Sequence, residues 1–206
     1  MPIMRLSPKR ADNFGTLIHD PSIHPTAYIG PGCVIGSMPE IRDLWNVAAT
    51  ERLVAPHSVK IGAHAILTAN VRVDAGSRRD TIIGINCFIM NGVYIAHDCL
   101  LESNVTIAAG ACLAGHVSVH AGAYIGMNAS IHQWQVIGAY AMIGMGAVIP
   151  KLLVVRPGYT YVGNPARCLG VNHVGLERAG LTLQDVEALD AEFFESFFVD
   201  NIITHG

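Results

Sequence analysis

The strongest constraint on the fold of this chain is a six-residue period of branched aliphatic residues. From Ile83 onward, every sixth residue is Ile, Leu or Val. The series is Ile83, Ile89, Ile95, Leu101, Ile107, Leu113, Val119, Ile125, Ile131, Ile137, Ile143 and Ile149. Four positions later in each hexad the residue is usually small, with Gln135 as the polar exception. Because a helix repeats every 3.6 residues and a strand every two, this period predicts a triangular solenoid of short strands and corners.

Three hexads would close one coil, so residues that lie three hexads apart should stack on successive coils. The same register is present earlier, at Ile23, Ile29 and Ile35, and again at Ile61, Leu67 and Val73. Two segments interrupt it, at about 37–58 and 75–82. Insertions must leave the coil as loops, and such loops often carry function.

We therefore predict an all-β, parallel β-helix domain over residues 1–168, with loops near 37–58 and 75–82. Residues 169–206 should form a short C-terminal α-helical segment. Within it, Thr182 to Val199 has the N-cap and apolar spacing of an amphipathic helix.

Composition excludes several classes of protein. Charged residues make up only 14% of the chain and no basic run occurs, which argues against nucleic-acid binding. The five cysteines form no CxxC pair, so we expect reduced thiols filling small core positions in a cytoplasmic protein. The first residues lack the apolar core of a signal peptide, and no segment is long enough to predict a transmembrane helix.

A polar cluster is expected where the coils stack. The three-hexad spacing places Asp98 beneath His116 and His97 beneath Gly115, with His132 close by. Histidine can take a proton from a nucleophile that attacks a thioester, and a neighbouring carboxylate can fix its tautomer. The backbone N–H of Gly115 could stabilise the oxyanion. Alternatively, these are exposed corner histidines, because the chain holds ten histidines.

Several segments in order resemble the UDP-N-acetylglucosamine O-acyltransferases of lipid A synthesis. They are IAHDC (95–99), LAGHVSV (113–119), IHQW (131–134), GVN (170–172) and GLERAG (175–180). The resemblance implies a left-handed β-helix, no bound cofactor, and acyl-CoA or acyl carrier protein (acyl-ACP) as co-substrate. It also implies a homotrimer with active sites between subunits.

The resemblance assigns roles to individual residues. His97 would be the general base, Asp98 would orient it, and Gly115 would supply the oxyanion N–H. His116, His132 and Gln133 would contact the substrate, and Asn172 and Arg178 would lie near the nucleotide and donor.

Departures from that family bear on the substrate. Tyr94 replaces a second histidine, three residues before the base, and is a candidate substrate contact. Met145 stands where the family limits acyl-chain length, so a bulky Met should shorten the groove; otherwise it simply fills a gap. The helical end is also shorter, which weakens the case for binding a carrier protein.

Two further motifs resemble other acyltransferases of this repeat class. VGNPARCLG (162–170) is similar to a segment of coenzyme A-dependent acetyltransferases, which makes Asn164 and Arg167 candidate donor contacts. Asn91, six residues before His97, matches the N-x5-HD pattern of nucleotide-linked aminosugar N-acetyltransferases. These motifs favour coenzyme A as donor and an amino group as acceptor.

The combined prediction is transfer of a short acyl or 3-hydroxyacyl group to the amino group of a nucleotide-linked sugar. The loop at 37–58 should cover the sugar or nucleotide, with Asp43 and Trp45 as its contacts. The alternative within this class is an acyl-ACP-dependent UDP-N-acetylglucosamine O-acyltransferase.

Two other classes remain open. A γ-class carbonic anhydrase shares such a solenoid and binds zinc through three histidines, for which His97, His116, His120 and His132 are available. The expected ligand spacing is absent, so we predict no metal site. A non-catalytic scaffold is the remaining alternative.

Overall fold

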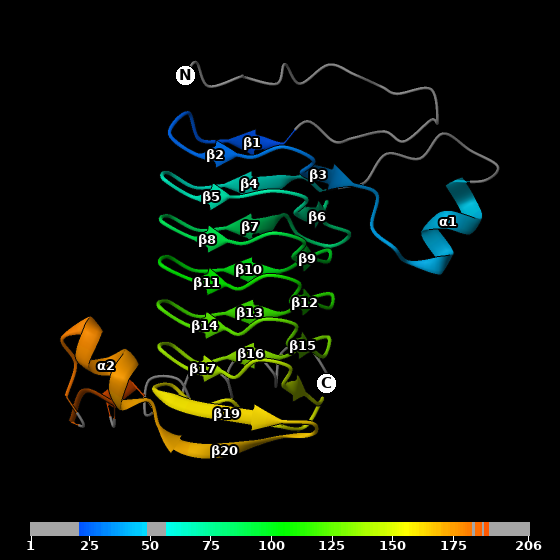
Figure 1. The fold of residues 1–206 in the computed structure, drawn as a ribbon. Coiled ribbons are helices and arrows are strands. Elements are labelled where there is room, and N and C mark those ends of the chain that lie inside the picture. The colour runs from blue at the N-terminus through cyan, green and yellow to red at the C-terminus, as the bar shows by residue number, and fades with distance from the viewer. Residues whose placement is uncertain (1–20, 49–56, 183, 187, 190–206) are drawn as a thin grey trace.

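The computed structural model describes residues 21–48, 57–182, 184–186 and 188–189. They form a β-solenoid of about six turns, in which three parallel sheets make the three walls of a prism (Figure 1). The predicted solenoid is therefore confirmed.

Each sheet takes one strand from each turn. Sheet A contains β1 (Ser22–Ile23), β4 (Val59–Ile61), β7 (Thr81–Ile83), β10 (Leu100–Leu101), β13 (Ser118–Val119) and β16 (Val136–Ile137). Sheet B contains β2 (Tyr28–Ile29), β5 (Ile66–Leu67), β8 (Phe88–Ile89), β11 (Thr106–Ile107), β14 (Tyr124–Ile125), β17 (Met142–Ile143), β19 (Tyr159–Gly163) and β20 (Ala166–Val171). Sheet C contains β3 (Val34–Ser37), β6 (Arg72–Asp74), β9 (Tyr94–Ile95), β12 (Cys112–Leu113), β15 (Ser130–Ile131) and β18 (Val148–Ile149).

The hexad residues form the core of the prism. In the regular part, each strand pairs in parallel with the strand three hexads away, as Leu101 does with Val119. Ile89, Ile107 and Leu113 point inward and are fully buried. Each such side chain stabilises the fold by about 1.5–3 kcal/mol through the hydrophobic effect. The small residues four positions later are buried as well, so both hexad signals describe the interior.

The chain turns at three edges, which we call A–B, B–C and C–A after the sheets that each joins. At most corners one residue adopts positive φ. Along the B–C edge this residue is Gly or Asn alone: Gly32, Asn70, Gly92, Gly110, Asn128 and Gly146. These are the residues that adopt the left-handed region at least cost.

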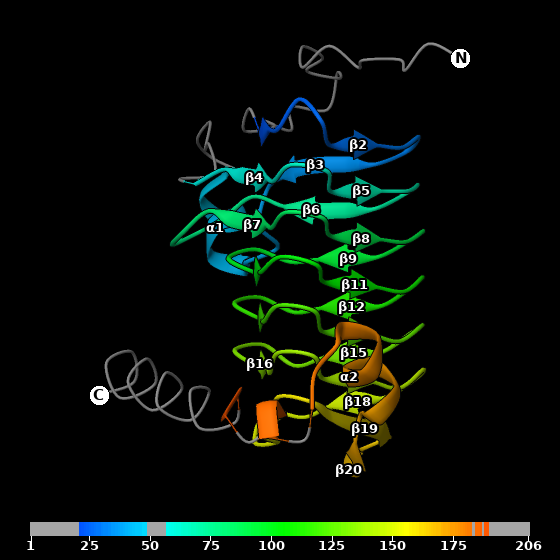
Figure 2. The same cartoon turned by 90° about the vertical axis from the view of Figure 1, so that its left-hand side faces the viewer.

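Both insertions leave the coil at the C–A edge. The first contains the helix α1 (Arg42–Ala48) and the second connects β6 to β7. Figures 1 and 2 both show them projecting from the same side of the prism. The expected loops are shorter than predicted, because Ser37 ends a strand and Thr81 begins the next one.

After β18 the regular coil ends in an antiparallel hairpin of β19 and β20. The predicted domain boundary at 168/169 falls inside β20, which runs to Val171. The helix α2 (His173–Ala179) follows and ends at Gly180, which has a φ of 72°. Most of the predicted helix from Thr182 to Val199 lies outside the described residues.

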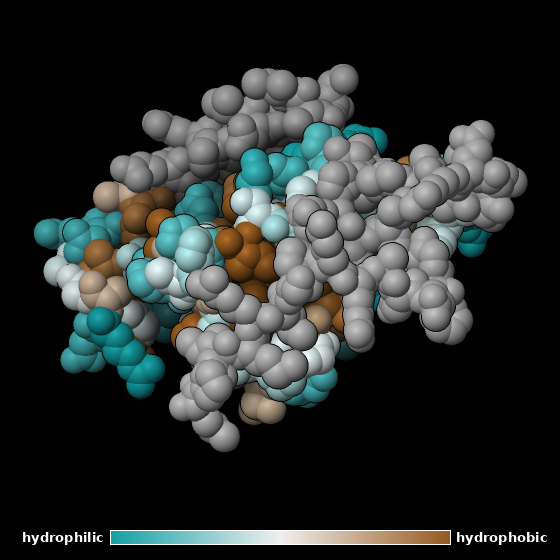
Figure 3. Space-filling view, turned by 90° about the horizontal axis from the view of Figure 1, so that it is seen from above, coloured by the Kyte–Doolittle hydropathy of each residue, from teal (hydrophilic) through white to brown (hydrophobic). Residues whose placement is uncertain are grey.

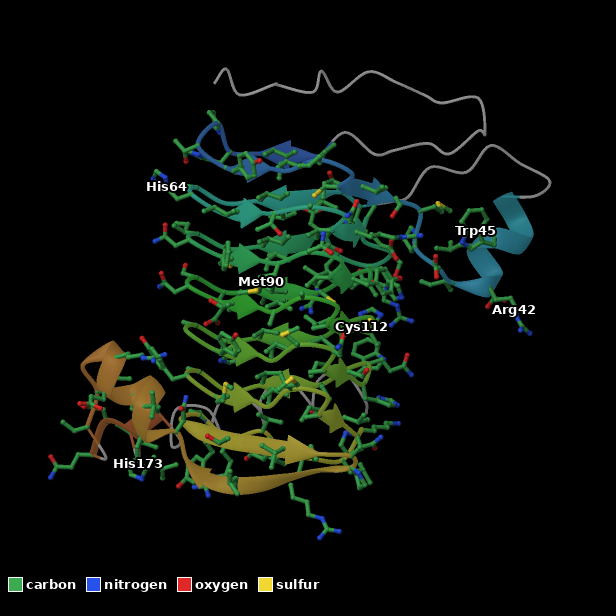
Figure 4. All side chains as sticks on the ribbon, viewed as in Figure 1. Arg42, Trp45, His64, Met90, Cys112 and His173 are labelled. Atoms are coloured by element: carbon green, nitrogen blue, oxygen red, sulfur yellow. The ribbon has the colours of Figure 1, made fainter. Side chains whose placement is uncertain are left out.

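The cysteines only partly follow the prediction. All five are free thiols; Cys87 and Cys99 are buried in the core, whereas Cys112 and Cys168 are exposed. Cys112 is exposed because it precedes the inward residue of its strand and faces outward, as its label in Figure 4 shows.

The first turn leaves apolar surface at its upper end. Ile23 has the register of an inward residue but is 38% exposed, because no described turn covers it. Figure 3 looks down on this end and shows hydrophobic residues among hydrophilic ones. No helix among the described residues is long and apolar enough to cross a membrane.

Candidate active site

The A–B edge mixes Gly and Asn with His64 and Tyr140 at positive φ, whereas a different set of residues adopts positive φ along the C–A edge. They are Asp98, His116 and Trp134, which stack on successive coils with φ of 62°, 64° and 64°. None is Gly or Asn, so this backbone costs more here than at the B–C edge. Such strain tends to collect at functional sites, which directs attention to this edge.

His97 and Asp98 form a closely coupled pair at this edge. Nδ1 of His97 lies 2.6 Å from Oδ2 of Asp98. An ionised carboxylate can only accept hydrogen bonds, so the proton resides on Nδ1 of the imidazole. Nε2 of the neutral ring is therefore left as the basic nitrogen, which is the arrangement that a general base needs.

Asp98 is completely buried, yet it is strongly held in its ionised form. Its Oδ1 accepts the backbone N–H groups of Ser77, Arg78 and Arg79 at 3.0, 2.7 and 2.8 Å. Its Oδ2 accepts the Ser77 hydroxyl at 2.6 Å, in addition to His97. Burial alone would raise the pKa of Asp98, but these hydrogen bonds outweigh it and hold the pKa well below its usual range.

Gly115 provides open space beside the imidazole of His97. A Cβ at this position would lie 2.5 Å from Cε1 and 2.7 Å from Nε2 of His97, so no larger residue fits without moving the ring. The Gly115 N–H donates to no atom among the described residues, whereas its carbonyl accepts from Trp134 N at 3.0 Å. A free N–H next to a basic nitrogen can stabilise a developing oxyanion.

His116 completes the aromatic side of the site. Its ring meets His97 edge-to-face at a centroid distance of 5.0 Å and stacks on Trp134 at 3.6 Å. Nε2 of His116 lies 3.5 Å from Oδ2 of Asp98. Burial lowers the pKa of His116 to about 4, against the attraction of Asp98, so the ring is neutral at physiological pH.

A second buried carboxylate, that of Asp74, lies one coil earlier in the chain, at the end of β6. Asp74 accepts the Tyr94 hydroxyl at 2.5 Å, the Ser37 hydroxyl at 2.5 Å and Nε of Arg72 at 2.9 Å. Arg72 also pairs with Glu40 at 2.8 Å, which ties the first insertion to the coil. Burial and the bond to Asp74 raise the pKa of Tyr94 well above its usual value, so its hydroxyl stays protonated.

Of the other predicted substrate contacts, two lie at a corner of the C–A edge and two lie on the helix of the first insertion. His132 and Gln133 lie at the next C–A corner and are exposed. Asp43 and Trp45 lie on α1, where the Trp45 indole N–H donates to the carbonyl of Pro39 at 3.1 Å (Figure 4).

The predicted donor contacts lie elsewhere on the chain. Asn91 and Met145 are exposed at the B–C edge. Asn164 and Arg167 belong to the β19–β20 hairpin. Asn172 caps α2 through Gly175 N, and Arg178 is exposed on that helix. Figure 1 shows α2 on the opposite side of the prism from α1, so one chain does not bring these residues to His97.

The ligand atoms of His97, Asp98 and His116 lie within 4.8 Å of one another, which could suit a metal ion. The donor set fits a cation poorly, because the carboxylate oxygens of Asp98 already accept five hydrogen bonds. His120 and His132, which the carbonic anhydrase alternative would use, do not belong to this cluster.

Reasoning from sequence missed Asp74, Ser77, Arg78 and Arg79. The last three belong to the second insertion, whose path no hexad fixes. One sequence signal could have indicated this edge. The corner position with positive φ is Gly or Asn along the B–C edge, whereas along the C–A edge it is Asp98, His116 and Trp134.

The fold and the repeat resemble those of hexapeptide-repeat transferases with a left-handed β-helix. The family model "Bacterial transferase hexapeptide (six repeats)" matches residues 80–115, which include the His97–Asp98 pair. A comparison with curated protein sequences gives no significant match.

Solved structures show which members of the class the chain resembles. LpxA from Bacteroides fragilis, a UDP-N-acetylglucosamine acyltransferase, is 27% identical over 83% of this chain, with a TM-score of 0.71. The chain covers 64% of that protein's length. The UDP-N-acetylglucosamine acyltransferase of Campylobacter jejuni is 26% identical over 83% of this chain and 73% of its own, with a TM-score of 0.62.

A third structure is similar in fold alone. Perosamine N-acetyltransferase from Caulobacter crescentus is 24% identical over 75% of this chain and 58% of its own, with a TM-score of 0.51. The chain thus resembles hexapeptide-repeat transferases in its fold, at low sequence identity.

Proposed function

We propose that the chain transfers an acyl group from a thioester to a nucleotide-linked sugar, with His97 as general base. The observation that carries this proposal is the 2.6 Å contact of His97 Nδ1 with ionised Asp98, beside the open corner at Gly115. The similarity to two UDP-N-acetylglucosamine acyltransferases supports the substrate class.

The chemistry follows from the protonation state. The sugar nucleophile attacks the thioester carbonyl carbon while Nε2 of His97 takes its proton, and the charge of the resulting imidazolium is stabilised by Asp98. The Gly115 N–H donates to the oxyanion of the tetrahedral intermediate. The carbon–sulfur bond then breaks, and the leaving thiolate receives the proton from the imidazolium.

The preferred acceptor is an amino group and the preferred donor a short acyl- or 3-hydroxyacyl-coenzyme A. The motifs around Asn91, Met145 and Arg167 support this version. The second candidate is acyl-ACP-dependent transfer to a hydroxyl group, which the 27% identity to the Bacteroides enzyme favours.

The proposal includes a homotrimer with sites between subunits. Met145, Arg167 and Arg178 lie away from the C–A edge that holds His97, so only another copy of the chain could bring them to it. Light scattering in solution should give three times the chain mass, and a monomer that is fully active would contradict this part of the proposal.

The test is a rate measurement with a matched pair of histidine variants. His97→Asn should lower kcat about a hundredfold or more with a panel of UDP-, dTDP- and GDP-linked sugars. His64→Asn should leave kcat unchanged, because exposed His64 sits at the A–B edge with a φ of 57°, which Asn tolerates. Equal activity of the two variants would remove His97 from the mechanism.

Product analysis by mass spectrometry then separates the two candidates. Acetyl-coenzyme A and an acyl-ACP are offered in parallel, and amide and ester products differ in stability to mild base. A zinc-dependent activity with no acyl transfer would instead support the carbonic anhydrase alternative.

A further inference from the structure

The second insertion, residues 75–80 between β6 and β7, is held against the base by a single carboxylate. Three consecutive backbone N–H groups, from Ser77, Arg78 and Arg79, converge on Oδ1 of Asp98. The loop also turns tightly, since a Cβ on Gly76 would lie only 1.6 Å from the carbonyl oxygen of Arg79. The backbone of Arg78 is thus fixed next to the catalytic pair.

The two arginines of this loop are used differently. Arg79 is exposed but hydrogen-bonded: its Nε donates to the carbonyl of Asp98 at 2.8 Å, and its guanidinium reaches the Ser118 hydroxyl at 3.5 Å. Arg78 is exposed, and its guanidinium makes no hydrogen bond or ion pair with any described residue. The positive charges of both arginines contribute to lowering the pKa of His116.

The carboxylates around the loop do not neutralise Arg78. Asp98 and Asp74 are buried and accept hydrogen bonds from other groups. Asp80 pairs with Lys60 at 2.7 Å. Within the part of the chain that the structure describes, the Arg78 guanidinium is therefore an unpaired cation, on a backbone that Asp98 holds in place next to His97.

We propose that Arg78 binds the diphosphate of a substrate, most directly that of the nucleotide-linked sugar. This inference rests on the proposed function for the identity of the ligand. A guanidinium matches phosphate oxygens in a bidentate geometry, and a diphosphate ester would supply the negative charge that Arg78 does not find among the described residues. Because Asp98 anchors the loop, the same carboxylate that orients His97 also positions this anion site.

Binding measurements test the proposal without requiring turnover. Calorimetric titrations compare wild type, Arg78→Ala and Arg78→Lys with UDP, GDP, uridine, guanosine and coenzyme A. Arg78→Ala should weaken diphosphate binding about tenfold and leave nucleoside binding unchanged, and Arg78→Lys should lie between. The effect should shrink at high salt, because the site is exposed.

A charge-matched control separates local binding from the general field of the protein. Lys151→Ala removes an exposed cation farther along the same edge and should change the Kd for a diphosphate less than twofold. If Arg78→Ala weakened the binding of coenzyme A alone, Arg78 would still bind a diphosphate, but that of the acyl donor. Unchanged diphosphate binding by Arg78→Ala, or no diphosphate binding by wild type, would overturn the proposal. An inactive wild type whose diphosphate binding depends on Arg78 would instead contradict only the proposed reaction.

Discussion

Replacing Asp98 with Asn tests the coupling between carboxylate and base, because shape is kept while charge is lost. The amide oxygen can take the place of Oδ1 and still accept the N–H groups of Ser77, Arg78 and Arg79. The amide nitrogen then replaces Oδ2 and faces Nδ1 of His97. An amide NH2 only donates, so the imidazole proton must move to Nε2, the nitrogen that should accept the substrate proton.

The expected loss follows from this exchange of tautomers. General base catalysis contributes a factor of about 10²–10⁴ to the rate, so kcat of Asp98→Asn should decrease by a factor in that range. Hydrogen bonds to a charged group contribute about 1.5–3 kcal/mol each and neutral ones about 1. Each contact of Asp98 should therefore weaken by at least about 0.5 kcal/mol, and over all of them we expect a loss of at least about 2 kcal/mol. For a domain of this size that lowers Tm by about 4–8 °C.

The stability difference should depend on pH. The folded-state pKa of Asp98 is lowered, so its contribution is complete above the unfolded-state value of about 4 and is lost as pH falls below it. Melting curves of wild type and Asp98→Asn should therefore converge in acid. Glu102→Gln is the control, because Glu102 also accepts a backbone N–H but is exposed at the A–B edge. A folded Asp98→Asn protein with kcat within threefold of wild type would refute the tautomer argument.

Three further substitutions test other parts of the edge. Gly115→Ala should displace the imidazole of the base and lower kcat about a hundredfold with little change in Tm; an unaltered kcat would show that the ring can shift harmlessly. The His116 pKa is lowered to about 4, so the free energy of unfolding of wild type should fall as pH drops from about 6.5 toward 4. Urea unfolding at several pH values should show that the free energy of unfolding of His116→Gln depends less on pH than that of wild type. The same pH dependence in both proteins would contradict the lowered pKa of His116. Tyr94→Phe removes a donor from buried Asp74 and should cost about 1–3 kcal/mol in chemical denaturation, whereas exposed Tyr124→Phe should cost nothing measurable; equal stability of the two would argue against the network.

The sequence predicted the fold well because the interior repeats. Each branched residue of the hexad series fills an equivalent place, so the period alone gives the register of strands that pair across successive coils. The same spacing placed His97 beside Gly115, which the structure shows as the predicted close approach.

The insertions could not be predicted in the same way. Their residues belong to no repeat, so the hydrogen bonds of Ser77 and Arg79 to Asp98 depend on a loop path that no spacing fixes. The roles of Met145 and Asn172 also remain predictions, since both residues lie on other edges than His97.

The second insertion leaves the prism and returns to it without changing the register of the coil, whereas the pairing of β3 with β6 shifts between Ile35 and Ser37, where the first insertion begins. β6 and β9 still pair residue for residue across the second insertion, with Arg72 opposite Tyr94 and Val73 opposite Ile95. Segments at this edge can therefore change in length and composition while the imidazole and the interior stay where they are. An engineer could graft a new loop between β6 and β7 to alter substrate choice, provided that the replacement still offers N–H groups to the carboxylate of Asp98.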